Sequence, residues 1–369
     1  MSRLPRPLMP SPLRRHRQRN RVRAPRQAVR RLLLPVELVL LAVAALVAAT
    51  GLLIGLLCLP LDRRMRVPRL CLFALSYLTM EVAVLAAAAV LWLRHLPALL
   101  RRSSSRAKWI ADHEALLGWA LTRVLASAHR WVRFSVEVDA SGEPPAFTSA
   151  QPVLVLARHG GLGDSFALVH LLLTRYRRHI RVVLKDVLQL DPALDVLLNR
   201  LNYYFLPSSS GAGEDLSERL AALAVELGAG EALLVFPEGG NWTPSRRRRA
   251  IRRLRREGKA DAATAATLME HVLPPRPGGV LACVAARPEI PIVIVAHAGL
   301  DGIVNPRQLW AALPLKDAMV IRSWEAAEPP AEPDDRVAWL TTEWAIVDEW
   351  IDAYHAGDLR IAREHHGTG

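Results

Sequence analysis

The chain has 369 residues, of which 51% are hydrophobic, and its 48 Lys and Arg against 35 Asp and Glu give a formal net charge of +13. A basic surplus of this size favours anionic partners such as phospholipid headgroups or phosphorylated ligands, whereas the 6% aromatic content is thin for stacking on nucleic-acid bases. Three cysteines, Cys58, Cys71 and Cys283, exclude a disulfide framework and a paired-cysteine metal site.

The first 31 residues differ in composition from the rest of the chain. Residues 1–31 hold eleven arginines, five prolines and no acidic residue. Like charges repel one another and proline disrupts helices, so we expect a disordered basic tail. Its simplest role is to fix membrane topology by its charge, since no nucleic-acid-binding motif accompanies it.

Two long apolar runs follow and predict a membrane hairpin over residues 32–100. Leu38–Leu61 carries no charge, and the second run, from Arg69 to Arg94, is interrupted only by Glu81. A helix of about 20 apolar residues crosses the hydrocarbon core. The arginines that flank the hairpin place both ends, and the domain that follows, on the cytoplasmic side of the cell membrane. Three arginines in the short loop between the runs leave a re-entrant hairpin open.

Two features next to the hairpin have more than one reading. A carboxylate in the middle of a membrane helix is costly, so Glu81 is expected to form an interhelix hydrogen bond, with a functional role as the alternative. Residues 103–131 have apolar side chains at helical spacing. This amphipathic helix lies either along the membrane surface or against the following domain.

The remainder, residues 101–369, predicts a single catalytic domain. A strand is expected at Val132–Val138, and strands and helices alternate from Val153 onward, which indicates an α/β fold with a mainly parallel sheet covered by helices on both faces. The expected strands are Val153–Leu156, Ile180–Leu184, Tyr203–Leu206, Ala232–Phe236, Val280–Ala285, Ile292–Ala296 and Ala318–Ser323. The expected helices are Ser165–Tyr176, Pro192–Leu201, Glu214–Leu227, Asp261–Val272 and Asp335–Tyr354.

A histidine and an aspartate share a glycine-rich turn after the first of these strands from Val153 onward. Ala157–Asp164 reads Ala-Arg-His-Gly-Gly-Leu-Gly-Asp, and its glycines allow a bend that folds Asp164 back onto His159. A carboxylate on one imidazole nitrogen fixes the tautomer and leaves the other nitrogen as a general base. Ligands bind at the carboxyl ends of strands in open α/β sheets. A surface histidine with a helix-capping aspartate is the alternative.

A second turn of the same kind follows the strand expected at Ala232–Phe236. It reads Phe236-Pro237-Glu238-Gly239-Gly240. Parallel strands end at the same edge of a sheet, so Glu238 and Gly239 are expected on the edge that carries His159. Pro-Glu-Gly alone is a common turn, but two such turns in one sheet favour a shared site.

These motifs resemble those of the 1-acylglycerol-3-phosphate acyltransferase family of glycerolipid acyltransferases. The family has His-x4-Asp, a Lys-containing block, Phe-Pro-Glu-Gly and a proline-containing strand, which correspond here to His159–Asp164, Leu184–Leu188, Phe236–Gly239 and Glu289–Val293. The block from Thr243 to Arg276 is most similar to the branch that contains lysocardiolipin and related lysophospholipid acyltransferases. The resemblance covers about residues 150–300.

The resemblance implies a function and a set of site residues. His159 would be the general base that takes a proton from an acceptor hydroxyl, which attacks the thioester of acyl-CoA or acyl carrier protein, and Asp164 would orient the imidazole. The acceptor would be a lysophospholipid such as 1-acylglycerol-3-phosphate, taken from a phospholipid membrane. Its pocket would be lined by Lys185, Phe236, Pro237, Glu238, Gly239 and Gly240. No metal or redox cofactor is implied, and no nucleic acid is an expected partner.

The chain departs from the family pattern in three places. Arg158 stands before the histidine where asparagine is usual, Gly240-Asn241 stands where Thr-Arg is usual, and Pro207–Ser210 lacks a further usual arginine. The two missing arginines are thought to hold the acceptor phosphate. Their possible replacements are Arg158, Lys185 and Arg246–Arg249; otherwise the acceptor is not a simple glycerol phosphate. The basic run that continues to Lys259 is either a lipid-headgroup contact or a solvated face.

Three other functions use the same residues. Leu156–Gly160 resembles the Arg-His-Gly motif of histidine phosphatases, whose histidine is phosphorylated, but that reading leaves the second turn and the hairpin unexplained. Gly163–Phe166 with Asp352 and His355 resembles the Gly-Asp-Ser esterases, with Ser165 as nucleophile, although eight residues separate this serine from its strand. The third is a lipid-binding relative without catalytic activity.

Overall fold

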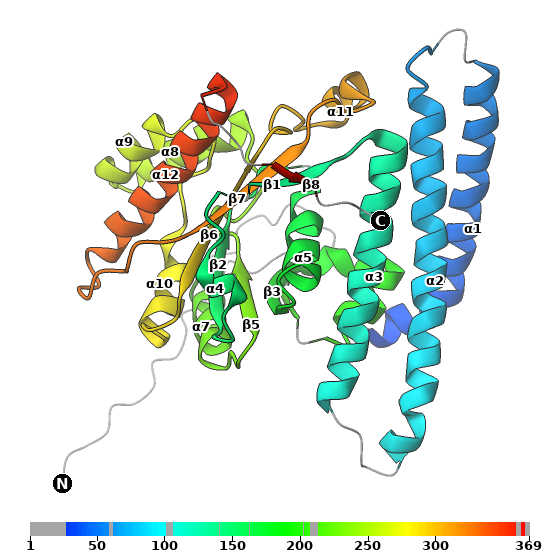
Figure 1. The fold of residues 1–369 in the computed structure, drawn as a ribbon, viewed down its shortest axis with the longest axis horizontal. Helices are drawn as coiled ribbons and strands as arrows, with labels where there is room; N and C mark the ends of the chain where they lie inside the picture. The colour runs from blue at the N-terminus through cyan, green and yellow to red at the C-terminus, as the bar shows by residue number, and fades with distance from the viewer. Residues whose placement is uncertain are drawn as a thin grey trace, which may run out of the picture.

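The computed structural model describes residues 27–58, 62–100, 106–139, 141–161, 163–201, 203–206, 213–358 and 363–365. Within this part of the chain, two long N-terminal helices stand beside a sheet that carries helices on both faces (Figure 1). The mixed α/β class and the mainly parallel sheet expected from the sequence are therefore confirmed.

The sheet brings the two motif-bearing strands next to each other. Its order is β4-β3-β5-β2-β6-β7-β1-β8. The strands are β1 Val136–Asp139, β2 Val153–Ala157, β3 His179–Lys185, β4 Tyr204–Leu206, β5 Glu231–Val235, β6 Ile292–Ala298, β7 Met319–Glu325 and β8 Arg363–His365. Strands β4 to β6 in this order are all parallel, β7 is antiparallel to β6, and β8 is antiparallel to β1. Leu156 of β2 pairs with Val235 of β5 and Ile294 of β6, so the turns after β2 and β5 meet, next to the last residues of β6.

Both faces of the sheet are buried, as the alternation along β2 shows. Val153, Val155 and Ala157 pack with α2, α3, α5 and α6, whereas Leu154 and Leu156 pack with α7 to α10 and α12. The helices of the domain are α3 Arg106–Val132, α4 Pro145–Thr148, α5 Asp164–Thr174, α6 Pro192–Leu198, α7 Gly213–Val225, α8 Pro244–Arg256, α9 Ala260–Leu268, α10 Pro277–Ala286, α11 Pro306–Ala312 and α12 Arg336–Ala356. A parallel strand covered on both sides needs apolar residues at every position, and all five residues of β2 are buried.

Two of the expected strands differ from the structure. The strand expected at Val280–Ala285 is wrong, because this segment forms α10, which starts at Pro277 and buries Val280, Cys283 and Val284. A short apolar run does not distinguish a buried strand from a buried helix, and here proline in the first turn and burial at helical spacing decide for the helix. The strand expected at Val132–Val138 begins only at Val136, since α3 continues to Val132.

The two N-terminal helices, α1 Gln27–Leu57 and α2 Arg66–Leu100, are each long and apolar enough to cross a membrane. They pack against each other, and α2 also packs against α3 and α6 (Figure 1). Helix α1 starts inside the segment expected to be a disordered tail, whose residues 1–26 lie outside the described part. The amphipathic segment expected at 103–131 forms α3, which packs on α2 and α5, so the reading in which it rests against the domain is confirmed.

Polar contacts join α2 to the domain. The Glu81 carboxylate, which is 1% exposed, accepts a hydrogen bond of 3.1 Å from the backbone N–H of Ala193 in the first turn of α6. Tyr77 donates to Asp191, and Arg200 donates to the carbonyl of Ala88 at 2.7 Å. The interhelix hydrogen bond expected of Glu81 is thus confirmed, with a helix N-terminus as its donor.

Candidate active site

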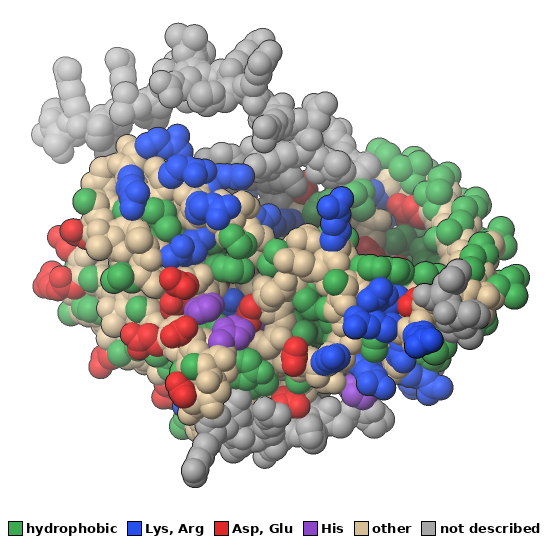
Figure 2. All heavy atoms as spheres, turned by 90° about the horizontal axis from the view of Figure 1, so that it is seen from above, with side chains coloured by type: hydrophobic (Ala, Val, Ile, Leu, Met, Phe, Trp, Pro, Cys, Tyr) green, Lys and Arg blue, Asp and Glu red, His purple; other side chains and the backbone are tan. Residues whose placement is uncertain are grey.

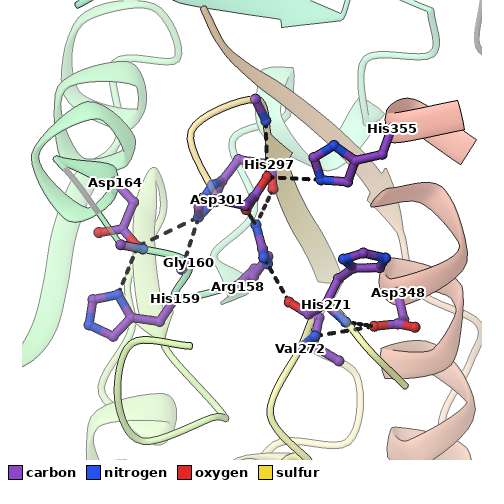
Figure 3. Close-up of polar contacts among 12 residues, drawn as sticks. Arg158, His159, Gly160, Asp164, His271, Val272, His297, Asp301, Asp348 and His355 are labelled. Atoms are coloured by element: carbon purple, nitrogen blue, oxygen red, sulfur yellow. Dashed lines mark hydrogen bonds and ion pairs between the residues drawn. The ribbon is translucent and has the colours of Figure 1, made fainter. Parts of the chain in front are cut away.

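The turn after β2 holds an imidazole and a carboxylate in contact. His159 Nδ1 lies 2.8 Å from Asp164 Oδ2, as the fold-back expected from the glycines requires (Figure 3). Gly161 and Gly163 adopt φ values of 144° and 73°, which disfavour other residues. The Asp164 side chain is 3% exposed and that of His159 is 17% exposed. The arrangement therefore keeps the carboxylate in the protein and leaves His159 Nε2 to act on a substrate.

Asp164 is held as an anion by its hydrogen bonds. Oδ2 also accepts from the N–H of Gly161 at 3.1 Å, and Oδ1 accepts from the N–H of Ser165 at 2.6 Å. Burial by itself would raise the pKa of the Asp164 carboxyl, but the hydrogen bond from His159 and the nearby imidazole of His297 outweigh it and hold the pKa well below its usual range. A fixed anion beside the imidazole stabilises the imidazolium that forms during general-base catalysis.

The second turn, Phe236–Gly240, is joined by hydrogen bonds to the turn that carries His159. Glu238 Oε1 accepts from the backbone N–H of His159 at 3.0 Å, and Oε2 accepts from that of Leu273 at 2.9 Å. The N–H of Trp242 donates to the carbonyl of His159 at 2.7 Å. The ring centroids of Phe236 and His159 are 4.7 Å apart. Burial raises the pKa of Glu238 to about 7. Both Glu238 oxygens thus bind backbone groups, and this residue joins the two turns.

Arg158 does not face the site. Its guanidinium is fully buried and donates Nη1 to the carbonyl of His297 at 2.6 Å and Nη2 to the carbonyl of His271 at 2.7 Å. It also forms an ion pair with Asp301. Because these contacts direct the guanidinium into the protein (Figure 3), Arg158 is not the replacement for a phosphate-binding arginine.

Lys185 and Arg246–Arg249 are the other residues proposed to replace the phosphate-binding arginines. Lys185 ends β3 and is exposed. Arg246 donates to the carbonyl of Asn241 at 2.9 Å, directly after the second turn. Arg246 and the other arginines of the run lie on α8, and α8 belongs to the face of the sheet opposite the hairpin (Figure 1).

Arg276 is a cation of the site that sequence reasoning missed. Its backbone N–H donates to the carbonyl of Pro237 at 2.9 Å. A Cβ atom on Gly239 would come within 2.9 Å of the Arg276 guanidinium carbon, so the side chain lies on the second turn. The guanidinium therefore lies beside this turn, although Arg276 stands 37 positions after Gly239 in the sequence.

His297 is the second residue that sequence reasoning missed. It lies near the end of β6, is 5% exposed, and places Nε2 3.6 Å from Asp164 Oδ2. The available signal was its position directly after the strand expected at Ile292–Ala296. In the described part of the chain, no group of three or more His, Cys, Asp or Glu side chains is placed to hold a metal ion.

Comparison with known proteins agrees with this geometry. Residues 138–297 match the family model described as Acyltransferase. The protein is an acyltransferase enzyme. The matched segment contains both turns, and it extends from β1 to His297. No curated protein matches the chain. The individual roles of His159, Asp164, Lys185 and Phe236–Gly240 in this acyltransferase stay predictions.

The geometry of the acyltransferase domain does not assemble the competing sites. Ser165 Oγ contacts Asp164 Oδ1 at 3.1 Å, whereas His355 pairs with Asp301 and Asp352 pairs with His271. The serine, aspartate and histidine of an esterase are therefore not joined to one another. For a histidine phosphatase, Arg158 beside the histidine points into the protein and offers no cation to a phosphoryl group.

Proposed function

We propose that this acyltransferase transfers a fatty acyl group from acyl-CoA or acyl carrier protein to a hydroxyl of a lysophospholipid, such as 1-acylglycerol-3-phosphate, in phospholipid biosynthesis or remodelling. The observation that carries the proposal is the 2.8 Å contact between His159 Nδ1 and a buried Asp164, which leaves Nε2 on the open side of the turn. The apolar hairpin supports a lipid substrate.

In the proposed reaction, His159 Nε2 removes the hydroxyl proton while the hydroxyl oxygen attacks the thioester carbonyl carbon. The tetrahedral intermediate then expels the thiolate, which takes the proton from the imidazolium. A carbon–oxygen bond replaces a carbon–sulfur bond, and the proton passes from the acceptor to the thiol. Asp164 stabilises the imidazolium between the two steps.

The acceptor's anionic group is assigned to the side of the second turn. Arg276 lies against Gly239, and Gly239 follows Glu238, whose carboxylate binds the backbone of His159. A guanidinium matches phosphate oxygens in a bidentate geometry. Arg276 therefore supplies the cation that an acceptor phosphate needs, and it does so from a different part of the chain than the family pattern.

The hairpin is proposed to lie in the cytoplasmic face of the cell membrane without crossing it. Arg69 donates to the carbonyl of Trp131 at 3.0 Å, and the carbonyl of Ala88 binds Arg200. These two contacts are about 28 Å apart along α2, nearly the whole thickness of the hydrocarbon core. A spanning α2 would draw the domain into the lipid. Arg64 of the loop also donates to the carbonyl of Ala311 in α11, at 3.2 Å.

The surface left for lipid is the side of the hairpin that faces away from the domain. Figure 2 shows apolar side chains gathered where α1 and α2 lie, with basic side chains beside them. The exposed apolar residues of α1 include Leu32, Val39, Leu40, Leu46, Val47, Leu53 and Leu57. An apolar surface of this size in water would cost free energy, which burial in lipid removes.

The experiment that tests the proposal compares purified wild-type, His159→Ala and Ser165→Ala proteins. Each is given 1-acylglycerol-3-phosphate and a long-chain acyl thioester, either of CoA or of acyl carrier protein. The release of free thiol is then measured. We expect His159→Ala to lose at least about 10²–10⁴-fold in kcat, and Ser165→Ala to stay active. Dependence on Ser165, phosphate trapped on His159, or a folded His159→Ala protein with wild-type transfer would each contradict the mechanism.

A further inference from the structure

Asp164 has a second imidazole neighbour for which the proposed reaction gives no role. His297 reaches it from β6 (Figure 3). Its Nε2 lies 3.6 Å from Asp164 Oδ2, the same oxygen that contacts His159 Nδ1 at 2.8 Å. Two histidines, one on the turn after β2 and one on β6, therefore contact the same buried carboxylate oxygen.

The His297 ring also packs against Gly160 in the turn that carries His159. The backbone N–H of Gly160 points at His297 Nε2, with 3.4 Å between the two nitrogens. A Cβ atom on Gly160 would lie 2.6 Å from His297 Cε1 and 2.7 Å from Arg158 Nη1. The turn that carries His159 is thus packed against the His297 ring with no room for a larger residue.

His297 is itself fixed through its backbone. Its carbonyl accepts from Arg158, whose guanidinium pairs with Asp301. Asp301 also accepts from the N–H of Gly299 at 3.1 Å and lies 3.3 Å from His355 Nε2 on α12. Arg158 Nη1 and Nη2 both have acceptors, whereas its buried Nε has none among the described residues. The bonds from Nη1 join the end of β2 to the end of β6.

We propose that His297 is a positioning residue that holds Asp164 and the Gly160 turn in the arrangement that His159 needs. The proposal rests on the proposed function, in which His159 is the base. His297 Nε2 cannot accept from the N–H of Gly160 and donate to Asp164 at the same time. We assign the hydrogen to Nε2, because Asp164 is an anion and a charged acceptor makes the stronger hydrogen bond. This contact keeps Oδ2 in place and withdraws part of its negative charge from His159. The titratable or charged groups around His297 are Arg158, His159, Asp164, Asp301 and His355.

Three substitutions separate positioning from packing. His297→Gln places an amide nitrogen close to the former position of Nε2, so it can still donate to Asp164. His297→Asn is polar but too short to reach the carboxylate, and His297→Leu fills the space without donating. Two amides of similar polarity thus serve as a matched pair.

We expect kcat to fall roughly 10- to 100-fold in His297→Leu and His297→Asn, the loss found when partners that orient metal-bound histidines are removed. The acceptor KM should stay the same, because His297 is buried behind Asp164. The acid limb of kcat/KM should move to higher pH, since the full charge of Asp164 then stabilises the His159 imidazolium. His297→Gln should restore both kcat and the acid limb.

A histidine NMR titration of the same proteins follows the His159 ring without needing turnover. We expect its titration to move to higher pH in His297→Leu and to return in His297→Gln. This readout separates the positioning role of His297 from the proposed acyl transfer, because it responds to His297 even if wild-type protein transfers no acyl group. An unmoved His159 titration, or losses of kcat that follow melting temperature alone in all three variants, would overturn the positioning role.

Discussion

At the scale of single residues, Glu238 connects the two turns, and its replacement should show this. Its two oxygens accept from the backbone N–H groups of His159 and Leu273. In Glu238→Gln, one of these N–H groups must face the amide NH₂. A buried donor without an acceptor costs about 1–3 kcal/mol. We therefore expect a lower melting temperature together with a lower kcat.

The measurement belongs at pH 8.5, above the pKa of about 7 that burial gives Glu238, so that the wild-type carboxylate is ionised. Glu257→Gln is the control, because Glu257 is exposed at the end of α8. Equal melting temperatures and equal kinetics for the two variants would show that Glu238 is only a turn residue.

Arg276 gives a prediction about the acceptor. Arg276→Gln should raise the KM for a phosphate-bearing acceptor about 10- to 100-fold with little change in kcat, since hydrogen bonds to charged groups contribute about 1.5–3 kcal/mol. Arg256→Gln on α8 makes the same change of charge on an exposed site. The contact with phosphate is refuted if a monoacylglycerol, which lacks the phosphate, shows the same rise in KM.

The residues of the site differ in how far sequence could reveal them. His159, Asp164 and Glu238 stand in short motifs after apolar strands, and their local spacing is enough to predict a shared edge. His297 and Arg276 reach the turns only because β6 pairs with β2 and because α10 begins at the second turn. Such contacts depend on strand order and loop path, which no local pattern contains.

At the scale of elements, α12 is tied to the sheet through an ion pair that titrates. The hydrogen bond from His355 to Asp301 raises the pKa of His355 above its unfolded value of about 6.5. Its stabilisation is therefore fully present below about pH 6.5 and is lost as pH rises through the folded pKa. The difference in unfolding free energy between wild type and His355→Leu should be larger at pH 5.5 than at pH 9.

Denaturant unfolding at the two pH values checks this, with His129→Leu as the control because His129 is exposed and contacts Ser135. A difference that does not change with pH, or one that grows toward pH 9, would contradict a protonated His355 at Asp301. The partial exposure of His355 screens the pair, so a modest change is expected.

Element boundaries show the same limits of sequence reasoning. Most strands and helices were predictable, because strand-length apolar runs separated by turns indicate a parallel sheet. The segment that became α10 was not, since six apolar residues fit a strand or a buried helix equally well. The position of β1 beside β7 could not be predicted from the sequence either. Val136 pairs with Met319, far along the chain, and only the tertiary fold brings the two strands together.

At the scale of the whole molecule, the proposed function leaves two arrangements of the hairpin to distinguish. A spanning hairpin and one that stays in a single leaflet both leave the two ends on the cytoplasmic side, so a fusion to the C-terminus does not separate them. They differ at the loop. Cys58 directly follows α1 and is exposed, whereas Cys71 is partly buried and Cys283 is buried.

We therefore predict that Cys58 reacts with a membrane-impermeant maleimide only from the cytoplasmic side of sealed vesicles. The contacts from Arg69 to Ala88 hold α2 along the domain, and the loop reaches α11 through Arg64. Cys58→Ser identifies the signal, and Glu332→Cys in the same background, at an exposed position of the domain, reports the cytoplasmic side. Labelling of Cys58 from the opposite side would show that the hairpin crosses the membrane, and the contacts between α2 and the domain would then have to break.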